Sequence, residues 1–299
     1  MDSSVCQRII SYPKREAQDS MVVSCTRAKF MATFYQQDFS LPDSLIFYIA
    51  TNPKTAELYL KMIKTCKYFF VKNPIIIIDC LDTFGGKWRV NEKPLDLTKY
   101  NCKYWITDVI SVSASVFVDK NILSTIIPKL YQCDVKCLSI SHQIISFNDL
   151  SFIISSAEEI YFNNVIVKKC NSVIPLEGII EIAVCAKSVN IFKPTITTKT
   201  MKELTKLSHF LKLYDFTLHD LSEVFDLDAF YSYMKKNQDT QFFLTFFDEQ
   251  ISEGYMNRLE TIVDEILETK QFNYEPPVIN FTGLDIQKYK KLYRIYLFH

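Results

Sequence analysis

Glycine is scarce in this chain, which has 299 residues but 5 glycines. No three of these glycines have the spacing of a phosphate-binding loop, so the sequence does not predict a Walker-type or Rossmann-type nucleotide enzyme. Purely apolar runs, such as 75–78, are far shorter than the ~20 residues that cross a bilayer. We therefore expect neither a nucleotide-dependent enzyme nor a membrane partner.

Recognisable catalytic and metal-binding motifs are also missing from the sequence. Its 4 histidines lie in no G-x-S-x-G or H-E-x-x-H pattern. Asp215 and Asp220 flank His219, but no Ser or Cys nucleophile is placed beside them by its context. Cys133 and Cys137 lack a second Cys or His pair, so buried thiols explain them better than zinc ligands do. The sequence predicts a protein that is not an enzyme and uses no cofactor or metal.

Neither sign of charge dominates, because 34 Lys and Arg balance 34 Asp and Glu. The whole molecule therefore has no field that attracts nucleic acid or anionic membranes. The 9 cysteines are odd in number and scattered, unlike a disulfide framework. The first residues lack the apolar stretch of a secretory signal. Together these features predict reduced thiols and a cytoplasmic or nuclear location.

The character of the sequence changes along the chain. Residues 1–37 are polar and mixed in charge, which predicts a loosely held tail. Residues 38–74 carry apolar side chains at helical spacing, such as Tyr59 and Ile63, and predict a small helical module. In residues 75–299 short apolar strands alternate with helices, so we assign them to one strand–helix domain.

An apolar ladder recurs within the last domain. The pattern apolar-x-apolar-x-x-apolar-x-apolar is complete where it starts at 160, 211 and 279, and imperfect at 138, 189 and 242. These starts have an irregular period centred on the range of leucine-rich repeats. Because parallel strands joined through helices stack side by side, the units would form an arc. The sequence thus predicts an α/β fold, with an irregular leucine-rich-repeat-like solenoid and a parallel sheet after the helical module.

Helix-capping residues follow the ladders. Asn148, Asp226 and Ser252 each precede an amphipathic run and are predicted N-caps. Pro175 opens another such run, as proline does in a first helical turn. In the helical module, Asn52 before Pro53 predicts the start of a helix for the same reason.

Strand residues that alternate with the inward ones would face the concave side of the arc. Aromatic rings there suit the binding of a protein, because rigid rings bury area at little entropic cost. A second possibility is that neighbouring loops or the tail cover these rings. The predicted contacts for a target protein are Tyr161, Asn163, Phe192, Lys212, Tyr214, Phe243 and Thr245.

The segment 41–69 resembles an F-box, a small trio of helices that opens with Leu-Pro and closes near a Cys-Lys/Arg-x-Phe element. Here these elements read Leu41-Pro42 and Cys66-Lys67-Tyr68-Phe69. An F-box commonly precedes leucine-rich repeats. The segments LPDSLIFYIATNP, KTCKYFFVKNP, WITDVISVS and IIPKLYQCDVKCL make the chain similar to the divergent F-box proteins of nematodes.

This resemblance implies a non-catalytic substrate adaptor of an SCF-type (Skp/Cullin/F-box) ubiquitin ligase. The helical module would dock on a Skp-type adaptor and through it reach a cullin. The repeats would hold an unidentified target protein for ubiquitin transfer by other subunits. The residues implied to contact the adaptor are Leu41, Pro42, Leu45, Ile49, Leu58, Ile63, Cys66 and Phe69.

Two alternatives remain open at this point. The repeats could form a scaffold without any role in ubiquitination, in which the helices of 41–70 cap the arc and the repeats cover Leu41, Pro42 and Leu45. Weak nucleic-acid binding is the other, because the segment 288–296 interleaves basic and aromatic residues. A polar end cap of the repeats explains this segment better, so we do not expect nucleic acid as a partner.

Overall fold

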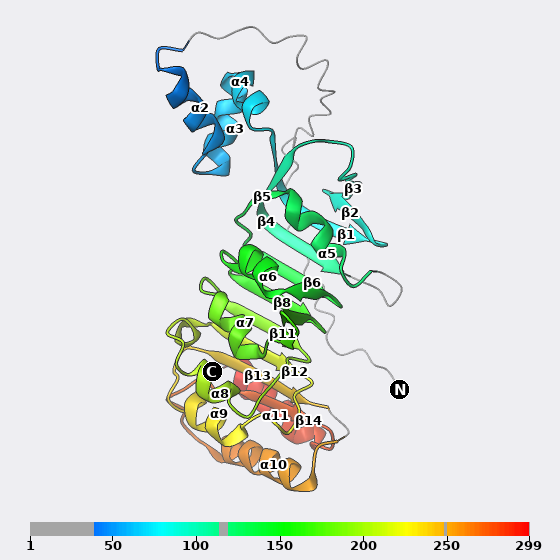
Figure 1. The fold of residues 1–299 in the computed structure, drawn as a ribbon. Coiled ribbons are helices and arrows are strands. Elements are labelled where there is room, and N and C mark those ends of the chain that lie inside the picture. Colours follow the sequence, from blue (N-terminus) through cyan, green and yellow to red (C-terminus); the bar gives the residue numbers. More distant parts are fainter. Residues whose placement is uncertain (1–38, 114–118, 248–249, 299) are drawn as a thin grey trace.

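A computed structural model of the chain describes residues 39–113, 119–247 and 250–298 (Figure 1). The predicted tail, 1–37, lies outside the described residues. The structure is mixed α/β and is built on an 11-stranded, mostly parallel sheet with a separate 3-stranded sheet beside it. Among the described residues no helix is both long and apolar enough to cross a membrane.

Three short helices lie at one end of the molecule (Figure 1). They are α2 (Asp43–Thr51), α3 (Ala56–Thr65) and α4 (Lys67–Lys72), all within the predicted helical module. The predicted helix start at Asn52 is wrong, because Asn52 ends α2 and its side chain donates to the Tyr48 carbonyl. Thr55 caps α3 instead, accepting a hydrogen bond from the Leu58 amide at 3.1 Å.

The parallel strands follow one another in space in the same order as along the chain. Each one pairs in parallel with the next, so the predicted parallel sheet is confirmed. They are β1 (Ile75–Phe84), β4 (Lys103–Ser113), β6 (Cys137–Ser141), β8 (Glu159–Asn163), β11 (Ser188–Phe192), β12 (Asp215–His219), β13 (Gln241–Phe246) and β14 (Val278–Phe281). Next to β1, β2 (Lys87–Val90) and β3 (Lys93–Pro94) add an antiparallel edge, and β5 (Leu130–Cys133) pairs with β4.

Helices that follow the strands cover one face of the sheet (Figure 1). They are α5 (Ile122–Ile126), α6 (Phe147–Ile154), α7 (Leu176–Ile182), α8 (Thr200–Leu204), α9 (Leu227–Met234) and α10 (Glu253–Glu268). Alternate strand residues, such as Ile160 and Phe162 of β8, meet these helices in one continuous apolar core. The final helix, α11 (Ile286–Phe298), contacts β14 and α10.

The predicted helix caps are confirmed in part. Asp226 accepts a hydrogen bond from the Ala229 amide at 2.9 Å, and Ser252 accepts one from the Tyr255 amide at 3.4 Å. Asn148 does not cap its helix, because α6 begins one residue earlier and Ser146 is its cap. The small sheet is made of β7 (Ile144–Ser146), β9 (Ile166–Lys169) and β10 (Ser172–Val173), and its strands β7 and β9 contact α6.

The same backbone turn recurs where four of the parallel strands end. His142, Asn164, Lys193 and Asp220 follow β6, β8, β11 and β12, and their φ angles lie between 52° and 55°. The amide of His142 donates to the carbonyl of Asn163 on the next strand at 2.8 Å, and Asn164 and Lys193 make the equivalent bond one and two strands later. Consecutive strand ends are therefore structurally equivalent, although side chains other than glycine occupy the left-handed position.

The predicted strand that starts at Leu211 is wrong. This residue lies in a 3₁₀ turn, η2 (Phe210–Lys212), and is half exposed, while β12 begins further along the chain. Phe216 and Leu218 supply the core-facing pair of β12. Lys212 and Tyr214 therefore precede the strand and do not lie on its open side.

Candidate functional site

An exposed apolar surface covers much of α2. Its only buried residues are Ile46 and Ala50, although the helix is apolar on nearly every side. Leu45 and Ile49 lie one turn apart and are 50% and 38% exposed, and Leu41, directly before the helix, is 46% exposed. A helix with apolar residues all round is normally buried, so this surface is typical of one that binds a partner. We call Leu41, Pro42, Leu45 and Ile49 the apolar docking face; Leu58 of α3 is a further exposed residue, at 44%.

The remaining residues implied to bind the adaptor hold the helices together. Ile63 is half-buried and packs against the cluster around Tyr59. The Cys66 Sγ accepts a hydrogen bond from the Tyr68 amide at 3.4 Å, which caps α4. The ring of Phe69 lies 6.0 Å from that of Tyr68. The structure thus places the apolar docking face on the surface, whereas Ile63, Cys66 and Phe69 are half-buried.

A buried aromatic cluster joins the helices to the sheet. Tyr59 of α3 packs against Ile75 of β1 and Trp105 of β4, and all three are fully or almost fully buried. The Tyr59 hydroxyl donates to the Asn73 carbonyl at 2.6 Å and accepts from the Ile75 amide at 3.2 Å. Burial raises the pKa of Tyr59 to about 12, so the hydroxyl stays protonated and can donate. We call Tyr59, Ile75 and Trp105 the junction cluster.

Two longer-range hydrogen bonds reinforce this junction. The Tyr131 hydroxyl of β5 donates to the carbonyl of Thr51 at the end of α2, at 3.2 Å. The Asn73 side chain donates to the carbonyls of Ala50 and Thr51 at 3.2 and 3.3 Å. These bonds connect α2 to the start of the sheet, so the apolar docking face has a fixed position relative to the strands.

The second candidate surface is the face of the sheet opposite α5–α10, which we call the open face. The parallel register aligns its residues in rows across the strands. Five of the predicted contacts for a target lie on it, and Lys212 and Tyr214 do not, because β12 starts after them. The predicted residues on the open face are Tyr161, Asn163, Phe192, Phe243 and Thr245.

Neighbouring aromatic rings form a continuous row across part of the open face. The His219 ring stacks on Phe192 with 3.9 Å between the ring centroids, and it lies 5.6 Å from Phe243. Phe243 in turn lies 6.4 Å from Tyr296 of α11. We call these four residues the aromatic row. Sequence reasoning missed His219 on this face, although its alignment with Phe192 follows once β12 is placed correctly.

Burial in the aromatic row lowers the pKa of His219 from 6.5 to about 4, although Asp220 opposes this shift. The ring is therefore neutral at pH 7. Its Nδ1 lies 3.4 Å from the Thr245 hydroxyl. The unfolded chain binds a proton at His219 between pH 6.5 and 4 while the folded chain does not, so acid in this range favours unfolding.

We predict that His219→Phe makes the free energy of unfolding less sensitive to acid. Phenylalanine cannot bind this proton. As the pH falls from about 7.5 to about 4.5, the free energy of unfolding of the variant should therefore rise by about 2 kcal/mol relative to that of the wild-type protein. Urea unfolding of both proteins at a series of pH values measures the difference, in which titration of other groups cancels. Parallel curves for the two proteins would contradict the low pKa of His219.

The basic C-terminal segment is tied to the rest of the fold at its start. Lys288 Nζ lies 2.8 Å from Glu260 Oε1 and 2.7 Å from Asp264 Oδ1, both on α10. The hydrogen bonds that Lys288 donates to the carboxylates of Asp264 and Glu260 raise its pKa. Lys288 is already paired with two carboxylates, which weakens the interpretation of α11 as a nucleic-acid surface.

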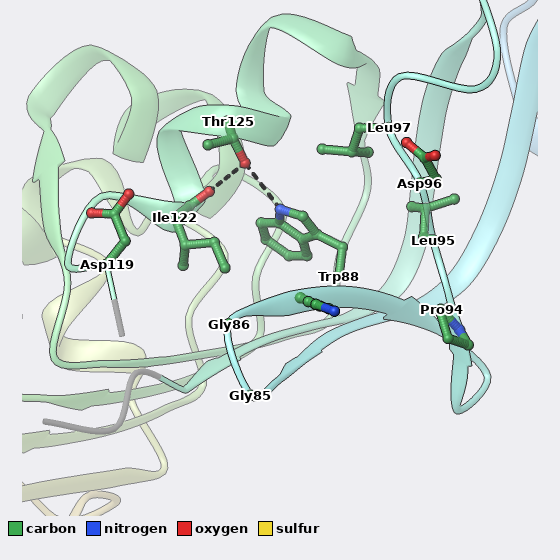
Figure 2. Close-up of a pocket in the computed structure, with 11 residues that line it drawn as sticks. Gly85, Gly86, Trp88, Pro94, Leu95, Asp96, Leu97, Asp119, Ile122 and Thr125 are labelled. Carbon is green, nitrogen blue, oxygen red and sulfur yellow. Dashed lines mark hydrogen bonds between the residues drawn. The ribbon is translucent and has the colours of Figure 1, made fainter. Parts of the chain in front are cut away.

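A cavity of about 650 Å³ lies between the β1–β2 hairpin and α5 (Figure 2). Trp88 forms one wall and donates from Nε1 to the Thr125 hydroxyl at 3.0 Å. The carboxylates of Asp96 and Asp119 in its lining accept hydrogen bonds from amides of their own turns. Among the described residues no base lies against the Thr125 hydroxyl, which donates to the Ile122 carbonyl. These contacts form no nucleophile–base pair, and no sequence motif marked these residues.

The part of the chain that the structure describes also contains no group of three or more His, Cys, Asp or Glu side chains that could hold a metal ion. No protein-family model matches the sequence, and no curated protein is significantly similar to it. The apolar docking face and the open face are therefore the two candidate functional surfaces of this protein.

Proposed function

We propose that this protein is a non-catalytic substrate adaptor of an SCF-type ubiquitin ligase. The helices α2–α4 act as an F-box-like module that binds a Skp-type adaptor, and through it a cullin. The open face of the sheet holds the target protein, and other subunits transfer ubiquitin. The exposure of the apolar docking face is the observation that carries this proposal.

The docking face has the chemistry of a stable protein interface. Its members are aliphatic side chains on α2 and directly before it, and none of them is charged. Burying one Leu or Ile side chain against a partner contributes roughly 1.5–3 kcal/mol. The few anchors Leu41, Leu45 and Ile49 therefore suffice for much of the affinity of such a complex.

The strand–helix domain fits a leucine-rich-repeat-like solenoid. Its parallel strands are stacked in chain order, and a left-handed turn with the same inter-strand hydrogen bond follows three of them in succession. Solenoids of this kind bind proteins on an extended sheet face. The junction cluster fixes the docking face relative to the sheet, which would hold a target at a constant position in the ligase.

Exposure of the docking face also favours this function over a scaffold without a role in ubiquitination. In the scaffold, α2–α4 would cap the arc and the repeats would bury Leu41, Pro42 and Leu45. Instead these residues are exposed and the helices are attached through Tyr59 on a different surface. The scaffold remains the outcome if no adaptor binds.

Co-purification of the full chain with a recombinant Skp-type adaptor, alone and joined to a cullin, tests the proposal. We expect a stable complex at micromolar concentrations that survives gel filtration. The cullin should elute with the chain when the adaptor is present and not otherwise. Separate elution of the chain and the adaptor would end the proposal.

A further inference from the structure

Two carboxylates are the charged side chains at the open-face positions of β6, β8 and β11–β14. Glu159 lies on β8 and Asp215 on β12, on either side of Ser188 in the strand register. Since neighbouring strands are about 4.8 Å apart, the backbones of the two acidic residues are roughly 10 Å apart. No lysine or arginine occupies an open-face position of these strands.

Neither carboxylate has a cationic partner among the described residues. Asp215 accepts hydrogen bonds from the hydroxyls of Ser188 and Thr217, at 3.1 and 3.2 Å. Glu159 accepts one from the Tyr161 hydroxyl at 3.4 Å. The nearby Lys187 does not neutralise them, because it pairs with Glu158 at 2.7 Å.

Aromatic rings lie further along the same strands. Tyr161 follows Glu159 by two residues on β8, and the aromatic row crosses β11, β12 and β13 at Phe192, His219 and Phe243. Ring faces bind guanidinium groups and the aliphatic part of lysine, and His219 adds no positive charge at neutral pH. An acidic or phosphorylated segment would meet two carboxylates and no cation on these strands.

We propose that the open face binds a basic segment of the target protein. One Lys or Arg side chain pairs with Glu159 and Asp215, and a neighbouring Arg or apolar side chain packs along the aromatic row. This inference rests on the proposed function, in that it names the class of target held by the sheet.

Binding of three fluorescent peptides to the full chain tests the inference. All three are 12 residues long and alternate Leu with Arg, Gln or Glu. We expect the Arg peptide to bind at least tenfold more tightly than the Gln peptide, and the Glu peptide to show no binding. Equal affinity of the wild-type chain for the Arg and Gln peptides would by itself overturn the inference.

Charge-neutral variants then locate the site. Glu159→Gln with Asp215→Asn should weaken binding of the Arg peptide at least tenfold, and Glu159→Gln alone about threefold. The control, Glu181→Gln with Glu268→Gln, removes two exposed carboxylates from α7 and α10 and should leave the affinity unchanged. Equal losses in the two double variants would contradict the assignment of the site to the open face.

Co-purification with the Skp-type adaptor separates this inference from the proposed function. The Glu159→Gln, Asp215→Asn variant should retain the adaptor, because both residues lie on the sheet and not on α2. Adaptor binding without selectivity for the Arg peptide would refute the inference alone. Selective peptide binding without the adaptor would refute the ligase role and leave the basic-segment site standing.

Discussion

Replacing both Leu41 and Ile49 with aspartate should abolish capture of a Skp-type adaptor. The two side chains are exposed on the apolar docking face, and neither is among the buried residues of α2, which are Ile46 and Ala50. Each aspartate would place an unpaired charge in an interface that loses its water on binding. We expect the affinity to fall by more than about 100-fold, which corresponds to ~2.7 kcal/mol.

A matched control separates this effect from a general effect of added charge. Val184 and Leu211 are also exposed apolar residues, at 56% and 50%, and they lie in the strand–helix domain. Their replacement by aspartate should leave adaptor capture unchanged. Pull-down with equal amounts of each variant and thermal unfolding provide the two measurements. Full capture by the Leu41→Asp, Ile49→Asp variant would refute the assigned docking face.

Replacing Trp105 with alanine should lower the free energy of unfolding by roughly 3–5 kcal/mol. Its side chain is fully buried in the junction cluster, and its ring centroid lies 5.4 Å from that of Tyr131. Its Nε1 donates to Asp134 Oδ2 at 2.6 Å. Alanine would leave a large cavity where the helices meet the sheet and would remove this hydrogen bond.

Trp105→Phe tests the same site more gently. Phenylalanine keeps much of the ring contact but cannot donate to Asp134, so we expect a smaller loss of about 1–3 kcal/mol. Urea unfolding measures both changes. Limited proteolysis should also cut the Trp105→Ala variant faster in the segment 52–55 between α2 and α3. A loss below about 1 kcal/mol for alanine would show that the junction cluster contributes little.

The parallel strands could be predicted because alternation is a local property of a half-buried strand. Ile160 and Phe162 point into the core and are separated by one residue on the open face, and the same spacing recurs on the neighbouring strands. The strand predicted from Leu211 is wrong because a 3₁₀ turn places apolar residues at the same spacing before Phe216. The local sequence does not distinguish a strand that starts at Leu211 from one that starts at Asp215. The pairing of β12 with β11 decides between the two.

The apolar docking face and the junction cluster differ in the same way. The exposed stripe of Leu41, Leu45 and Ile49 could be expected from the sequence, because the resemblance of 41–69 to an F-box implies that these residues contact a partner. The junction cluster could not be predicted, because it joins Tyr59 to Trp105 across a register that depends on the whole sheet. The assignment of 1–37, 38–74 and 75–299 to separate parts stays a prediction.

Both outer strands of the large sheet are poorly suited to pairing with a second molecule. At one end, β3 has 2 residues, and one of them is Pro94, which has no N–H to donate. At the other end, β14 has 4 residues, and α11 packs against it. Open sheet edges are the usual starting points for aggregation and fibril growth. Short and shielded edges should therefore protect this chain from edge-to-edge polymerisation, even though it exposes an apolar helix.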